Sequence, residues 1–70
     1  MKKDKARREI ILRFQKWVND RNIDNPTGTD VLLFYNELDI QQDPVLNFRA
    51  YGDKYQTVKA FLVNAGISKE

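Results

Sequence analysis

A chain of 70 residues has room for one small domain, which we expect to span residues 1–70. The sequence contains neither Cys nor His, which excludes disulfides, thiol and imidazole catalysis and the classical zinc sites. Hydrophobic residues make up 41% of the chain, and charged residues make up 31% with a net charge of only +2. This composition is typical of a folded globule with a core rather than of a disordered polyelectrolyte.

The first predicted element is a long amphipathic helix from Asp4 to about Arg21. Its apolar residues recur at the spacing of one helical face, at Ile10, Phe14, Trp17 and Val18. We expect residues 1–4 to form a disordered basic tail. The apolar run at residues 10–12 ends at Arg13, which is too short for a signal peptide or for a membrane span of about 20 residues. We therefore expect a cytoplasmic protein without a membrane segment.

A second helix is predicted from Thr29 to about Leu38. The preceding turn is built by residues 25–28, Asn-Pro-Thr-Gly, because the residue before a proline avoids the α region and glycine favours turns. Thr29 is the expected N-cap, since its hydroxyl can accept a hydrogen bond from a free backbone amide, and Asp30 lies near the positive end of the helix dipole. The inner stripe of this helix is expected at Val31, Phe34, Tyr35 and Leu38.

Two further helices are predicted in the last third of the chain. Asp43 is expected to cap a short third helix over Pro44–Tyr51, since proline is well tolerated at the first helical position. Gly52 interrupts this helix, and Gly52 or Asp53 caps a fourth one that ends at a left-handed Gly66. Its apolar face is expected at Tyr55, Val58, Phe61, Leu62 and Ala65. Strand signals are weak, so we predict an all-α fold, a small four-helix globular domain.

Positive charge is concentrated in the first predicted helix. Through Arg21 the chain has eight basic residues against three acidic ones, a net charge of +5, whereas the remainder has four against seven, a net charge of −3. On a helical wheel, the face opposite Phe14 carries Lys5, Arg8, Leu12 and Lys16. Such a face attracts phosphates or an acidic protein, although exposed basic residues also simply keep a small protein soluble. Leu12 favours a binding face, because an apolar side chain among cations resembles an interface anchor.

The segment Pro44–Val63 has the outline of a helix-turn-helix, with a short helix, a turn at Gly52 and a second amphipathic helix. Two residues depart from this motif: Phe48 stands where a small residue is usual, and Asp53 stands where an apolar residue is usual. The alternative is therefore an ordinary turn in a helical globule. Our first functional hypothesis is DNA binding by this unit together with the first helix. Phosphate contacts would come from Lys5, Arg8, Arg13 and Lys16, and contacts to bases or backbone from Gln56, Thr57 and Lys59.

The second hypothesis is a protein-interaction domain, an adaptor or an inhibitor. It would dock an acidic or amphipathic partner on Leu12 and its basic surroundings. DNA binding should weaken steeply with salt, whereas a protein interface should lose affinity when Leu12 is replaced. The expected partner is therefore DNA or an acidic protein, and the sequence does not determine the oligomeric state.

Catalytic and metal sites find no support in the sequence. The carboxylates lack the spacing of a calcium loop and are explained as helix caps and turn residues, at Asp20, Asp24, Glu37, Asp39 and Asp43. The three glycines are isolated, so they form no phosphate-binding loop. We therefore expect a non-enzymatic binding module with no cofactor, no metal and no small-molecule substrate.

Overall fold

The computed structural model describes residues 2–49 and 52–68, and within these ranges it is all-helical. The α-helices are α1 (Lys3–Asp20), α2 (Gly28–Ile40) and α3 (Lys54–Asn64), with a single turn of 3₁₀ helix, η1 (Pro44–Leu46), between α2 and α3. The all-α class is confirmed. The expected count of four α-helices is not, because three are found among these residues.

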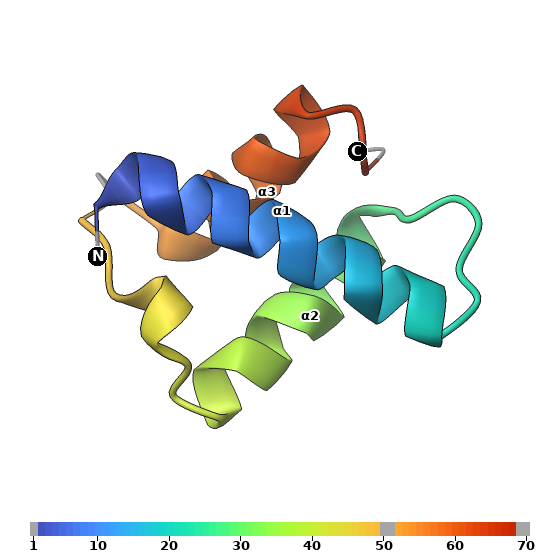
Figure 1. The fold of residues 1–70 in the computed structure, drawn as a ribbon, viewed down its shortest axis with the longest axis horizontal. Helices are drawn as coiled ribbons and strands as arrows, with labels where there is room; N and C mark the ends of the chain where they lie inside the picture. Colours follow the sequence, from blue (N-terminus) through green and yellow to red (C-terminus); the bar gives the residue numbers. More distant parts are fainter. Residues whose placement is uncertain (1, 50–51, 69–70) are drawn as a thin grey trace.

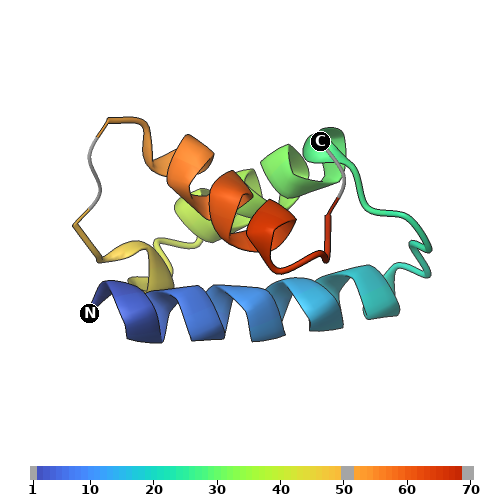
Figure 2. The same cartoon turned by 90° about the horizontal axis from the view of Figure 1, so that it is seen from above.

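The helices form two layers (Figure 1). Seen from above, α1 runs along one side of the molecule, and α2 and α3 lie together on the other side (Figure 2). Contacts join α1 to α3 and to η1, and join α2 to the same two elements. One side of α1 is therefore covered along its length, and the opposite side faces away from the rest of the fold.

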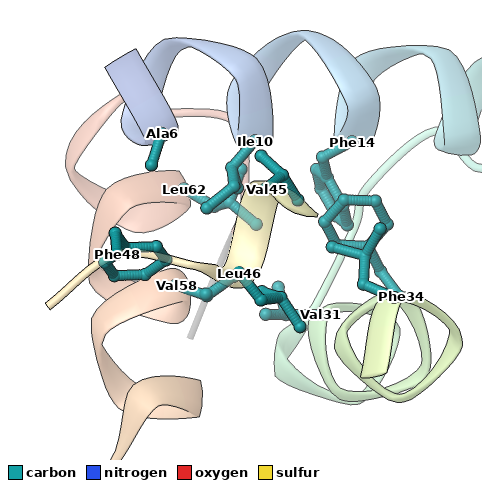
Figure 3. Packing of buried hydrophobic residues seen from close by; sticks show 11 residues of the cluster. Ala6, Ile10, Phe14, Val31, Phe34, Val45, Leu46, Phe48, Val58 and Leu62 are labelled. Carbon is teal, nitrogen blue, oxygen red and sulfur yellow. The ribbon is translucent and has the colours of Figure 1, made fainter. Parts of the chain in front are cut away.

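The core lies between these two layers. Side chains from α1 point toward those of α3 and η1 in Figure 3, where Ile10 lies near Leu62 and Val45. Phe14 meets the ring of Phe34 on α2 edge-on, with ring centroids 5.1 Å apart. The buried hydrophobic residues are Ala6, Ile10, Phe14, Val31, Phe34, Leu38, Val45, Leu46, Phe48, Val58 and Leu62. Most of them lie on the apolar faces that the helical periodicity predicts.

The start of α1 differs from the sequence expectation. The helix begins at Lys3, so Lys3 and Asp4 are helical although residues 1–4 were expected to be a disordered tail. The basic residues near the start of the chain are consequently fixed to a helix. None of the helices over residues 2–49 and 52–68 is long and apolar enough to cross a membrane.

The cap of α2 is Thr27 and not Thr29, which corrects the sequence prediction. The backbone amide of Thr27 donates to the Asp30 carboxylate at 2.9 Å, and the amide of Val31 donates to the Thr27 carbonyl at 3.1 Å. The second bond is the first i→i−4 bond of the helix itself, whereas the first belongs to a capping box, in which the cap and an acid three residues later satisfy free backbone groups. Asp30 stands three residues after Thr27, and Thr29 has no acid at that spacing.

The predicted third helix is reduced to η1. Asp43 does cap it, since its carboxylate accepts a hydrogen bond from the Val45 amide at 2.9 Å. The backbone then leaves the helical region at Asn47, which has a ψ of 65°, and Phe48 turns into the core at 5% exposure. Tyr51, the expected end of this helix, lies outside the described residues. The helix-turn-helix interpretation thus lacks its first helix over residues 44–49.

All three α-helices end with a residue in the left-handed conformation, namely Asn22, Gln42 and Gly66, at φ values of 56°, 52° and 73°. The amide of the following residue in each case donates back to a carbonyl five residues earlier, as in Ile67 to Leu62 at 3.1 Å. This is the Schellman termination. Gly66 confirms the sequence prediction. Ala65, expected on the apolar face of this helix, is instead its exposed C-cap.

Candidate partner-binding face

The inner and outer sides of α1 differ completely in burial. Ala6, Ile10 and Phe14 are each 0% exposed. The side chains predicted for the opposite side are all exposed, and Leu12 retains 62% of its accessible surface. We call this set the α1 outward face, and it consists of Lys5, Arg8, Leu12 and Lys16. These residues fall within about 80° of the helix circumference, so they form one continuous stripe.

The basic side chains of the α1 outward face are not used by the fold. The ion pairs found in the described part of the chain join Arg13 to Glu9 and Asp43, and Arg21 to Glu37. None of them involves Lys5, Arg8 or Lys16. Lys5 and Arg8 also line a shallow open hollow near the start of α1, together with Lys2 and Asp4. Three cations therefore surround Leu12 with their charges exposed to solvent.

Arg13 differs from the other predicted phosphate-binding residues. It makes an ion pair with Asp43, just before η1, and lies 3.9 Å from the carboxylate of Glu9 one turn earlier. Its charge is thus balanced by two carboxylates of the same molecule. Arg13 lies at the edge of α1 that faces η1, and it does not belong to the α1 outward face.

A second cluster, which sequence reasoning missed, joins the far end of α1 to α2. The indole Nε1 of Trp17 donates to the Glu37 carboxylate at 2.7 Å. The Arg21 guanidinium donates to the same carboxylate at 2.9 Å and lies 4.5 Å from the Trp17 ring centroid. These three residues with the Arg13–Asp43 pair form what we call the seam. The seam holds α1 against the neighbouring elements and uses charge for folding.

The residues predicted to contact DNA bases lie on α3. Gln56 is exposed, whereas Thr57 and Lys59 are half-buried, and the Thr57 hydroxyl is 3.4 Å from the Asp53 carbonyl. Figure 3 shows the buried side of α1 facing the buried side of α3, so the exposed sides of these two helices point away from each other. The structure therefore does not bring these residues together with the α1 outward face.

The carboxylates considered for metal binding are dispersed or occupied. Asp20 and Asp24 are exposed, and Glu37 and Asp43 belong to the seam. Among residues 2–49 and 52–68, no group of three acidic residues is placed to hold a metal ion. Asp39 lies near Tyr35, where burial, and then the charges of Asp39 and Asp53, raise the pKa of the phenol above 10.0. A raised pKa keeps Tyr35 protonated, which is the opposite of what a nucleophile needs.

Comparison with known protein families, with curated proteins and with solved structures finds no match to this chain.

Proposed function

We propose that this chain is a non-enzymatic protein-interaction module, and that the α1 outward face docks an acidic amphipathic segment of its partner. The observation that carries this proposal is Leu12, which is 62% exposed at the centre of three unpaired cations. An apolar anchor inside a ring of charge is the usual anatomy of a protein interface, in which a desolvated centre supplies affinity and a polar rim supplies orientation.

The rigidity of α1 supports the same proposal. Its inner side is anchored by fully buried residues, and its far end is held through the seam. A face that is already ordered loses little conformational freedom when a partner binds, so more of the contact energy appears as affinity. The partner's acidic groups would meet Lys5, Arg8 and Lys16, and its apolar residue would cover Leu12.

DNA binding is less well supported than a protein partner. The hypothesis needed a helix-turn-helix and a joint surface of α1 with α3. The first helix of that unit is replaced by η1, and the exposed sides of α1 and α3 point apart. Arg13, one of the four predicted phosphate contacts, is paired within the molecule. A duplex that bound α1 alone would do so through phosphate contacts, and its affinity would fall steeply with salt.

The test is a binding titration of the ¹⁵N-labelled protein with three probes. The first is a helical peptide with glutamates on one side and leucines on the other, the second is the same peptide with alanine for leucine, and the third is a short DNA duplex. Each titration is run at low and at moderate salt. We expect the first peptide to bind most tightly, with the largest amide shifts around Leu12.

The matched variants are Leu12→Ala and Gln15→Ala, since Gln15 is an exposed neighbour on the same helix. Leu12→Ala should lower the affinity for the first peptide by about tenfold or more, and Gln15→Ala should leave this affinity unchanged. If both peptides bound with equal affinity, Leu12 would not be the apolar anchor of the interface. Tighter binding of the duplex, with a steep loss on adding salt, would replace the protein partner by DNA.

A further inference from the structure

The outer side of α2 presents the largest exposed apolar side chains of the described residues apart from Leu12. Ile40 is 80% exposed, Leu33 is 51% exposed and Leu32 is 43% exposed. Asn36 lies between them on the helix surface, and Asp39 lies at the edge of the group beside Leu32; both are also exposed. We call these five residues the α2 outward face. Scattered exposed leucines are common, but three large aliphatic residues on one short helix form a patch.

The charge of α2 is opposite to that of α1. The 13 residues of α2 contain three acidic side chains and no basic one. Asp30 belongs to the capping box and Glu37 to the seam, so each has a role in the fold. Asp39 takes part in none of the ion pairs of residues 2–49 and 52–68. The α2 outward face is thus apolar with one unpaired negative charge.

These two faces are complementary but cannot meet within one molecule. The rings of Phe14 on α1 and Phe34 on α2 point toward each other across the core, so the exposed sides of the two helices point apart. In Figure 1, α1 crosses the front of the molecule, whereas α2 ends below it. The basic face with one leucine and the acidic face with three aliphatic residues can satisfy each other only between molecules.

From this complementarity we infer that the chain associates with itself, the α1 outward face of one copy docking on the α2 outward face of the next. This inference rests on the proposed function, because it names a second copy as a partner of the same basic face. Leu12 would pack between Leu33 and Ile40, and Lys16 or Arg8 would approach Asp39. Both faces are present in every copy, so they are always available at equal concentration.

This contact differs from an ordinary two-fold dimer. Each copy uses two different surfaces, so the interface is head-to-tail, and each dimer keeps one free face of each kind. Assembly therefore continues beyond the dimer, as an open chain or a closed ring. The contact is small, since α2 is only about 20 Å long, and opposite charges at its rim make it sensitive to salt. We expect weak association that increases with protein concentration.

The experiment is sedimentation equilibrium over a concentration series at low and at moderate salt. It uses the full chain and the variants Leu12→Asp and Ile40→Asp, which each damage one face. Ala60→Asp is the control, because it adds the same charge to the exposed side of α3. A second pair, Lys16→Glu and Asp39→Lys, tests the same faces through charge alone. Circular dichroism of each variant confirms that it is folded.

We expect the average mass of the unmodified chain and of Ala60→Asp to rise with concentration past that of a dimer, and to fall at moderate salt. Leu12→Asp and Ile40→Asp should each associate at least about tenfold more weakly. An equal mixture of the two should form a one-to-one dimer, in which the intact α1 outward face of Ile40→Asp docks on the intact α2 outward face of Leu12→Asp. Assembly should stop there, because the two faces left free are the damaged ones. This rescue is specific to a head-to-tail contact.

Two results would overturn the inference. One is a chain that stays monomeric at every concentration, and the other is a mixture that does not form the one-to-one dimer although the unmodified chain associates. The proposed function is judged separately by the acidic peptide. If the peptide binds at Leu12 while the chain stays monomeric, the proposed function stands and self-association fails. If neither occurs, both fail.

Discussion

Five basic residues of α1 and its C-cap form two groups that differ in what lies opposite them. Arg13 and Arg21 face carboxylates of other elements and form the seam, whereas Lys5, Arg8 and Lys16 face solvent. All five side chains carry a positive charge, and both groups lie along the same helix and its C-cap. Charge serves folding where a neighbouring element offers a carboxylate, and it remains available for binding where no element does. The comparison therefore separates charges that are paired within the fold from charges that face solvent, along α1 and its C-cap.

The largest effect is expected from breaking the inner side of α1. Phe14→Ala should lower the free energy of unfolding by about 3–5 kcal/mol, because Phe14 is fully buried and contacts the rings of Trp17 and Phe34. Leu12→Ala should change it by less than about 0.5 kcal/mol. Urea unfolding followed by the fluorescence of Trp17, the single tryptophan, measures both. Comparable losses for the two variants would show that Leu12 belongs to the core.

Glu37→Gln should have the next largest effect, because it neutralises the carboxylate shared by Trp17 and Arg21. Both charged partners are substantially exposed, so we expect a loss of only about 1 kcal/mol. The Trp17 emission of the folded protein should also change. Glu9→Gln is the control, since Glu9 lies 3.9 Å from Arg13 within the same helix, and it should leave stability and emission nearly unchanged. The seam would lose its structural role if the two variants behaved alike.

A substitution at Gln42, the residue before Asp43, should raise the stability of the protein instead of lowering it. Gln42 has a φ of 52°, a conformation that costs a residue with a side chain about 1 kcal/mol and glycine almost nothing. Gln42→Gly should therefore stabilise the protein by about 1 kcal/mol without breaking the Arg13–Asp43 pair. Gln41→Gly should destabilise it, because Gln41 is in the right-handed helical region. Thermal unfolding of the two variants should shift the melting temperature in opposite directions. Shifts in the same direction would contradict the left-handed conformation of Gln42.

The smallest effect concerns Asp39, the unpaired carboxylate of α2. Burial, then Asp39 and Asp53, raise the pKa of Tyr35 in the folded state. The folded state therefore favours the neutral phenol. The stabilisation that comes from this preference is complete below pH 10.0 and is lost as the pH rises through the raised pKa of Tyr35. Asp39→Asn should lower that pKa, as followed by the ring carbon resonances of Tyr35. Asp24→Asn should leave the pKa of Tyr35 unchanged, because Asp24 does not act on Tyr35. If Tyr35 titrated identically in the two variants, Asp39 would have no effect on its pKa.

The sequence predicts the long helices well because their apolar periodicity is strong. The burial of Ile10 and Phe14 in α1 and of Val58 and Leu62 in α3 follows from local patterns alone, as does the end of α3 at Gly66. The outward side of α1 also follows from the helical wheel, since the residues opposite Phe14 are exposed as expected. In these cases a local pattern and the tertiary structure agree.

The sequence does not predict features that depend on distant residues. Phe48 is buried against the ring of Phe61, and this packing ends the predicted third helix after one turn although Asp43 and Pro44 begin it correctly. Likewise, Trp17 and Glu37 are 20 positions apart, so no local spacing indicates their hydrogen bond. The Thr27 cap, in contrast, is encoded locally, because Thr27 and Asp30 have the three-residue spacing of a capping box.

The central claim is that the outer side of α1 is a free docking surface, and an amide shift map with the acidic amphipathic peptide tests it most directly. The account predicts that shifts concentrate on residues 5–16 of α1, centre on Leu12, and leave the amides of α3 unchanged. Shifts centred on α3, or on the core with loss of the folded spectrum, would contradict it.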